Sequence, residues 1–158
     1  MGMTPSSRTE AFQQWLDAYG ADHLHPRTHQ THALGIPLVV LSLMGFLNLI
    51  PGHRMVLGVE FGWTEVTLAA VLAFYGHHDL RIALIAAPLG AILIVLSRMI
   101  PTLGHAALFV TSWILQLWGH IVWEKNRPAF FKNVLQLLIG PAFFLAELLR
   151  IQRAPVRN

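Results

Sequence analysis

The 158-residue sequence contains no cysteine and few charged residues. The absence of cysteine excludes disulfide bonds, thiol catalysis and metal sites with cysteine ligands. Asp, Glu, Lys and Arg make up only 12% of the chain and hydrophobic residues 54%, whereas a soluble domain carries about 25% charged residues. Such a composition cannot cover a water-facing surface and indicates a protein of the lipid bilayer. The net charge of +3 is too small and too scattered for a nucleic-acid partner to be expected.

Long apolar segments follow a polar N-terminal region, and they predict an all-α, polytopic membrane helix bundle that forms a single domain over residues 1–158. The His-rich N-terminal segment, residues 10–33, begins with an amphipathic helix that is expected to lie at the membrane interface. Four spans are expected, over residues 34–50, 58–76, 82–100 and 103–123. The last apolar helix, over residues 129–149, contains Gly140 and Pro141 and is expected to be a re-entrant or interfacial fifth helix, with a full crossing as the alternative.

Basic residues suggest how these spans are oriented. With four crossings, the N-terminal region, the turn over residues 77–81 and the loop over residues 124–132 lie on the same side of the membrane. This side carries most of the Lys and Arg residues of the connecting segments. The positive-inside rule therefore predicts that it is cytoplasmic.

Nine histidines are many for a membrane protein, because imidazoles are costly in lipid and often mark function. The predicted topology places seven of them on the cytoplasmic side: His23, His25, His29, His32, His77, His78 and His120. Neutral imidazole is the commonest metal ligand and suits iron, zinc or copper. His29 and His32 share one face of a helix that can begin at Pro26, and His120 lies one turn before Glu124. Each of these histidines could instead be a polar anchor near the lipid headgroups.

Two blocks of the sequence resemble the signature motifs of a known family. One is Trp113–Pro128 (WILQLWGHIVWEKNRP), and the other is Tyr19–Pro26 (YGADHLHP), which leads to His32. Over nearly its whole length the chain resembles the 2-hydroxy fatty acid dioxygenase family. The resemblance implies a membrane-embedded, Fe(2+)-dependent enzyme that uses O2 to shorten 2-hydroxy fatty acids by one carbon, a step of lipid alpha-oxidation.

The resemblance also implies a set of metal ligands. The histidines that fall on those of the family are His23, His32 and His120, which are the expected ligands of one iron. His25 and His29 are candidates for additional ligands.

Two further residues are expected to be catalytic. Glu124 is expected to be a fourth ligand or to orient His120. Arg127, or alternatively Lys125, is expected to pair with the substrate carboxylate. The expected partners are a 2-hydroxy fatty acid, O2 and the lipid bilayer, and no oligomeric state is predicted. The expected location is a bacterial inner membrane, or the endoplasmic reticulum in a eukaryote, with the histidine cluster on the cytoplasmic side.

Other functions remain open at this point. A di-iron lipid hydroxylase or desaturase would need about eight histidines in boxes, and only fragments of such boxes are present, at His29/His32 and at His77/His78. A haem protein could use His105 and His120 at the two ends of one span. A small non-enzymatic helical bundle with interfacial histidines is the third alternative.

Overall fold

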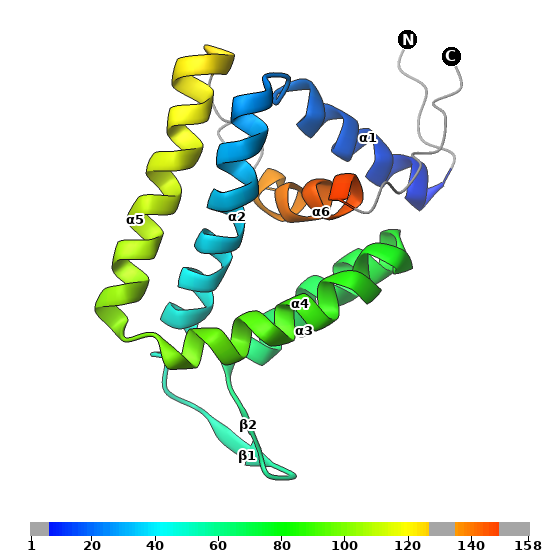
Figure 1. Ribbon diagram of the computed structural model, residues 1–158. Coiled ribbons are helices and arrows are strands. Elements are labelled where there is room, and N and C mark those ends of the chain that lie inside the picture. Colours follow the sequence, from blue (N-terminus) through cyan, green and yellow to red (C-terminus); the bar gives the residue numbers. More distant parts are fainter. Residues whose placement is uncertain (1–6, 127–134, 149–158) are drawn as a thin grey trace.

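Two helix pairs dominate the computed structural model, which describes residues 7–126 and 135–148. Helices α2 (Pro26–Leu47) and α5 (Thr102–Trp118) lie side by side along their lengths (Figure 1). Helices α3 (Trp63–His78) and α4 (Leu80–Met99) form the second pair, which runs at an angle to the first. The two pairs meet where α4 turns into α5.

Two shorter helices and a hairpin complete the fold. Helix α1 (Arg8–Ala21) packs against α6 (Gln136–Leu148), and both lie beside the upper part of α2 in Figure 1. Strands β1 (Arg54–Val56) and β2 (Val59–Phe61) form an antiparallel hairpin between α2 and α3. The π-helix η1 (Gly119–Glu124) extends α5. The hairpin and η1 therefore lie at opposite ends of the α2–α5 pair.

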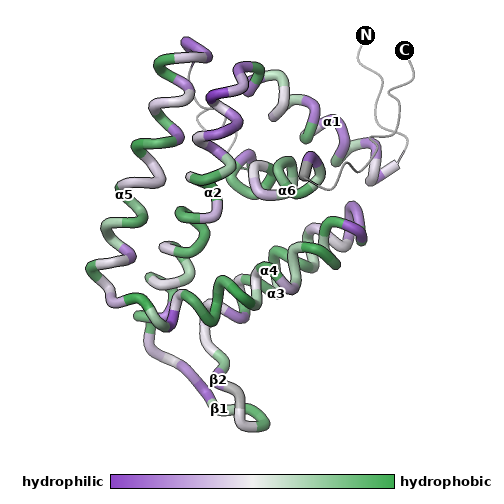
Figure 2. Tube along the Cα trace, in the orientation of Figure 1, coloured by the Kyte–Doolittle hydropathy of each residue, from purple (hydrophilic) through white to green (hydrophobic). Residues whose placement is uncertain are grey.

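Three helices in the described part of the chain are long and apolar enough to cross a membrane: α2, α4, and α5 together with η1. Only 28% of the apolar window of α4 and 17% of that of α5–η1 is buried inside the protein, so most residues of these windows are not buried. Hydrophobic residues recur along both helices (Figure 2). Exposed apolar helix surface is what a bilayer solvates. The structure therefore agrees with the all-helical fold and the membrane class that the composition indicates.

The structure does not form one continuous helix over residues 58–76, where a span was expected. Residues 59–61 form strand β2, and α3 begins only at Trp63. The Glu65 carboxylate accepts a hydrogen bond from the Gly62 N–H at 2.7 Å and pairs with Arg98 at 2.8 Å, which fixes the start of the helix there. With 16 residues, α3 is about 24 Å long, less than the roughly 30 Å of a hydrocarbon core.

Helix α1 buries its apolar face in protein, and its position at the membrane interface stays a prediction. Its apolar side chains Phe12, Leu16 and Tyr19 are buried in a core shared with α3, α4 and α6. The apolar face of α1 therefore packs on protein instead of lipid. An amphipathic pattern shows that a helix buries one face, but it does not show what covers that face.

The last helix is continuous through Pro141. Residues 127–134 lie outside the described part of the chain, and so does the expected start of this helix at residue 129. The 13 described residues of α6 extend about 20 Å, too short for a crossing by themselves. A re-entrant or interfacial position of α6 stays a prediction.

Asp79 caps α4 and makes the stability of the fold depend on pH. Its carboxylate accepts hydrogen bonds from the backbone N–H of Arg81 at 2.9 Å and from its guanidinium at 2.8 Å, and these bonds lower the pKa of Asp79. A carboxyl whose pKa is lower in the folded than in the unfolded state stabilises the fold above its unfolded pKa of about 3.9. That stabilisation is lost as the pH falls through the folded-state pKa.

We expect Asp79→Ala to lower stability by about 1 kcal/mol at pH 7, the usual cost of losing an N-cap. The loss should shrink as the pH is lowered from 7 to 2, because the parent protein then loses the same contribution. Thermal unfolding in detergent at a series of pH values measures this difference. A loss that is independent of pH would contradict the role of the charged carboxylate.

Candidate metal centre

Three histidines from distant parts of the sequence meet at one end of the α2–α5 pair. His23 lies between α1 and α2, His32 lies on α2, and His120 lies on η1. Each is only 2% exposed, and their ligand nitrogens lie within 4.8 Å of one another. Among residues 7–126 and 135–148, they form the only group of three or more metal-ligand side chains close enough to hold one ion. We call these residues the histidine triad.

The three rings of the triad stand nearly perpendicular to one another. Their centroids are 4.7 Å (His23–His32), 4.6 Å (His23–His120) and 4.9 Å (His32–His120) apart. The interplanar angles of the same pairs are 76°, 72° and 84°. Nearly perpendicular rings do not stack face to face, so their edges can converge on one ion and leave other coordination positions open.

Each triad histidine has an oxygen acceptor within hydrogen-bond distance of its Nδ1 atom. The Nδ1 atom of His23 lies 2.6 Å from the Tyr19 carbonyl oxygen, and that of His32 lies 3.0 Å from the Thr28 carbonyl oxygen. His120 Nδ1 lies 3.0 Å from Asn126 Oδ1. These oxygens only accept, so the ring proton sits on Nδ1 and the Nε2 lone pair remains for a metal.

The unused nitrogen of His23 supports this assignment. His23 Nε2 is buried and has no hydrogen-bond partner, which is costly for a polar atom unless something else binds it. Burial also lowers the pKa of His23 to about 4, so the imidazole is neutral near pH 7. Neutral imidazole is the form that coordinates metals.

Gly119 explains how His120 reaches α2. A Cβ atom at this position would lie 2.8 Å from Thr31 Oγ1, 3.2 Å from Thr28 Cγ2 and 3.3 Å from His32 Cε1. Only glycine allows η1 to approach α2 this closely. The Gly-His pair of the motif thus has a physical reason, and a π-helical turn is itself frequent at functional sites.

The side chain of Tyr19 fixes the ring of His23 by stacking on its face. The two rings stack with centroids 4.0 Å apart at 12°. Gly140 on α6 leaves room for the phenol, because a Cβ there would lie 3.1 Å from Tyr19 Oη. Helices α1 and α6 thus together position His23.

Comparison with known proteins tests the resemblance. A family model described as "2-hydroxy-palmitic acid dioxygenase Mpo1-like" matches residues 9–152, a range that contains the whole histidine triad. The chain belongs to this Mpo1-like family. It is 28% identical over 144 residues to the 2-hydroxy-palmitic acid dioxygenase MPO1 of Saccharomyces cerevisiae, an alignment that covers 85% of this chain and 77% of the yeast protein. No solved structure matches. Membership in the Mpo1-like family supports an oxidoreductase.

The structure gives Glu124 a different contact from the one expected. Its Oε1 accepts a hydrogen bond from the His25 N–H at 2.7 Å, and Glu124 is not part of the triad. The partner of His120 Nδ1 is Asn126. Asn126 lies within the sequence motif around His120, but helical spacing did not predict that the two side chains meet. Lys125 adopts a left-handed conformation with φ of 53°, which turns Asn126 back beneath His120. Periodicity gives no signal for such a turn.

The two candidate additional ligands lie apart from the triad. His25 caps α2, accepts from the Arg27 N–H at 3.1 Å and stacks on Trp123. His29 Nε2 donates to the His23 carbonyl oxygen at 2.6 Å, and its Nδ1 lies 3.2 Å from the Glu147 carboxylate. His29 therefore supports the loop that carries His23. Arg127 lies outside the described residues.

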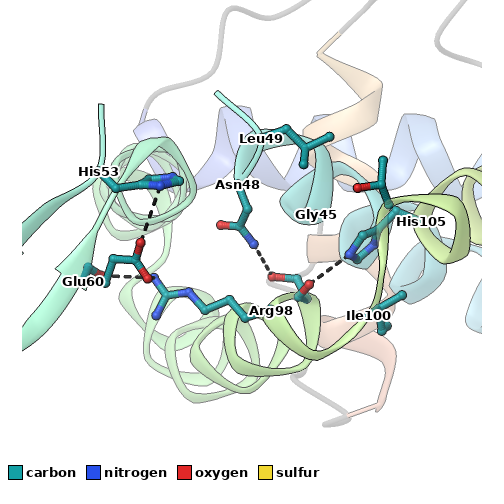
Figure 3. A pocket seen from close by; sticks show the side chains of 10 residues that line it. Gly45, Asn48, Leu49, His53, Glu60, Arg98, Ile100 and His105 are labelled. Carbon is teal, nitrogen blue, oxygen red and sulfur yellow. Dashed lines mark hydrogen bonds and ion pairs between the residues drawn. The ribbon is translucent and has the colours of Figure 1, made fainter. Parts of the chain in front are cut away.

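The opposite end of the α2–α5 pair contains a polar pocket of about 390 Å³ (Figure 3). It is lined by Gly45, Asn48, Leu49, His53, Glu60, Ser97, Arg98, Ile100, Thr102 and His105. Most of its polar groups bind one another: Asn48 donates to Ser97 Oγ at 3.0 Å, and His53 pairs with Glu60. His105 precedes His120 by 15 residues along one nearly continuous helix, about 22 Å. This pocket is therefore separate from the triad.

Proposed function

We propose that this protein is a membrane-embedded, Fe(2+)-dependent dioxygenase that acts on 2-hydroxy fatty acids. The observation that carries the proposal is the buried histidine triad, whose Nδ1 atoms are all bonded to oxygen acceptors. Membership in the Mpo1-like family adds the reaction class and the substrate class. Neither observation alone would suffice, because metal-binding histidines serve many reactions.

The donor set of the triad fits iron. Three neutral imidazoles suit a divalent first-row metal and leave open coordination positions, as non-haem iron oxygenases require. When bound, Fe(2+) would hold the substrate and O2 together and pass electrons from the hydroxy acid to O2. His23, His32 and His120 would hold it, and their acceptors at Tyr19, Thr28 and Asn126 would keep each ring aimed.

The substrate class fits the same centre. A 2-hydroxy acid presents a carboxylate and a neighbouring hydroxyl, two oxygens that can bind one metal together. Oxidative loss of the carboxyl carbon balances as R–CH(OH)–COOH + O2 → R–COOH + CO2 + H2O. The two reacting carbons of the acid lose four electrons in total, and O2 accepts them.

Two further residues, one of them outside the described part of the chain, complete the proposal. We propose that Arg127 pairs with the substrate carboxylate, since it follows Asn126 directly and a guanidinium binds carboxylates bidentately. We propose that Glu124 positions the loop that carries the first ligand, since its carboxylate accepts from the His25 N–H at 2.7 Å.

The location of the triad suits a lipid substrate. It lies at one end of α2 and η1, and both belong to helices that can cross a bilayer. A polar head could reach the metal at the membrane boundary while the acyl chain stays in the hydrocarbon. We propose that this boundary is cytoplasmic, as the distribution of basic residues predicts.

The test is turnover by the purified protein. Protein in detergent is loaded anaerobically with Fe(2+) and mixed with 2-hydroxyhexadecanoic acid and O2. We expect pentadecanoic acid by mass spectrometry, in a 1:1 ratio to the O2 consumed. Hexadecanoic acid, which lacks the hydroxyl, and protein loaded with Zn(2+) serve as controls. Product formation that is equal with Fe(2+) and Zn(2+), or no product at all, would overturn the proposal.

A further inference from the structure

We propose that Asn126 is a positioning residue that holds His120 as a neutral metal ligand and thereby makes the centre select an anionic chelating substrate. This inference rests on the proposed metal centre and goes beyond it. It assigns a role to a residue outside the triad, and it explains why the site should prefer a 2-hydroxy carboxylate over an uncharged diol.

Asn126 contacts both η1 and the loop before α2. Its Oδ1 accepts from His120 Nδ1 at 3.0 Å, and its backbone N–H donates to the His120 carbonyl oxygen at 3.3 Å. Its Nδ2 lies 3.5 Å from the carbonyl oxygen of Asp22, the residue before His23. One side chain therefore links the segments that carry two of the three ligands.

Asn126 is also the only side-chain acceptor among the three that orient the triad. His23 and His32 donate to the backbone carbonyls of Tyr19 and Thr28, which substitution cannot remove. The orientation of His120 depends instead on the identity of residue 126. A change at this position should thus act on His120 directly and on the loop of His23 through Asp22, while the backbone acceptors of His23 and His32 remain.

The chemical nature of this acceptor sets the charge of the centre. Metal-bound histidines often donate to a carboxylate, which makes the imidazole more basic and adds a negative charge. Here all three acceptors are neutral amide or carbonyl oxygens. A divalent ion held by three neutral rings keeps most of its charge, so an anionic ligand binds with a favourable Coulomb energy. An uncharged 1,2-diol has the same spacing of oxygens but gains no such Coulomb energy.

The test uses Co(2+) as a spectroscopic probe of the metal centre. Asn126→Leu removes the acceptor at similar size, and Asn126→Asp keeps the acceptor but adds a charge. Gln30→Leu and Gln30→Glu are the matched controls, because Gln30 is an exposed amide on α2 near the triad. For each variant, Co(2+) affinity is measured by competition with a chelator. The visible Co(2+) spectrum is then titrated with 2-hydroxyoctanoic acid and with 1,2-octanediol.

We expect Asn126→Leu to weaken Co(2+) binding about 10- to 100-fold, the usual effect of losing a partner of a metal-bound histidine. Asn126→Asp should bind Co(2+) at least as tightly as the parent, yet bind the hydroxy acid about tenfold more weakly with no change for the diol. The Gln30 variants should match the parent in both measurements.

The outcomes separate this inference from the proposed function. A parent protein that binds no Co(2+) would overturn the metal centre itself. A parent that binds Co(2+), together with an Asn126→Leu variant of equal affinity, would overturn only the role of Asn126. Asn126→Leu is not used if it loses its helical circular dichroism, and the test then depends on Asn126→Asp. If that variant binds the hydroxy acid as tightly as the parent does, the charge argument is wrong.

Discussion

Replacing His120 by alanine is expected to abolish both metal retention and turnover. The substitution removes one of the three nitrogens that lie within 4.8 Å of one another and leaves two buried imidazoles without a third ligand. Changing only the partner of a metal-bound histidine costs about 10- to 100-fold in affinity, and loss of the ligand itself should exceed this. Metal-to-protein ratios after dialysis, and product formation from 2-hydroxyhexadecanoic acid, measure the two effects.

His77→Ala is the matched control. His77 is exposed near the end of α3 and makes a ring contact with His78. Its loss should change neither the metal content nor the rate. Full activity in purified His120→Ala protein would contradict the triad, and an equal loss in His77→Ala would show that the effect is not specific to the centre.

Replacing Gly119 by leucine is expected to separate His120 from His32. The position just before His120 has no room for a side chain, since even a Cβ would lie 2.8 Å from Thr31 Oγ1. Overpacking of this kind typically costs about 1–3 kcal/mol. The relief available to the protein is to move η1 away from α2, which opens the triad. Metal content and the apparent melting temperature should both fall, with Gly119→Ala intermediate.

Gly76→Ala provides the contrast for this prediction. A Cβ at Gly76 in α3 would lie 3.7 Å from the Ala83 Cβ, an ordinary contact. Alanine is favoured over glycine inside a helix by about 1 kcal/mol, so this variant should be as stable as the parent or more stable. If Gly119→Leu kept its metal and its melting temperature, the close approach of η1 to α2 would not matter for the centre.

The sequence alone was sufficient for the class of the fold and for the three residues that meet. The low fraction of charge predicted a membrane helix bundle, and the motif around His120 predicted the family, which is confirmed. Helical spacing was less informative, since it placed His29 beside His32 on one face. In the structure the ring of His29 turns to the His23 carbonyl oxygen and to Glu147 instead.

The features that sequence reasoning missed arise from tertiary contacts. The start of α3 is set by Glu65, which pairs with Arg98, a residue 33 positions away. The face of α1 is covered by α6, about 120 residues later in the chain. Asn126 meets His120 only because a π-helix and a left-handed Lys125 precede it. None of these contacts follows from local periodicity, because each depends on a distant partner or on an irregular turn.

The distribution of the ligands along the chain has a consequence for biogenesis. Two of them lie among the first 32 residues, whereas the third is residue 120. The three nitrogens can therefore bind one ion together only after residue 120 has left the ribosome. An ion bound afterwards cross-links the beginning of the polypeptide to its later part, and ligand binding to the native state alone raises resistance to unfolding. With the metal centre as proposed, a bound ion should thus protect the folded chain against unfolding.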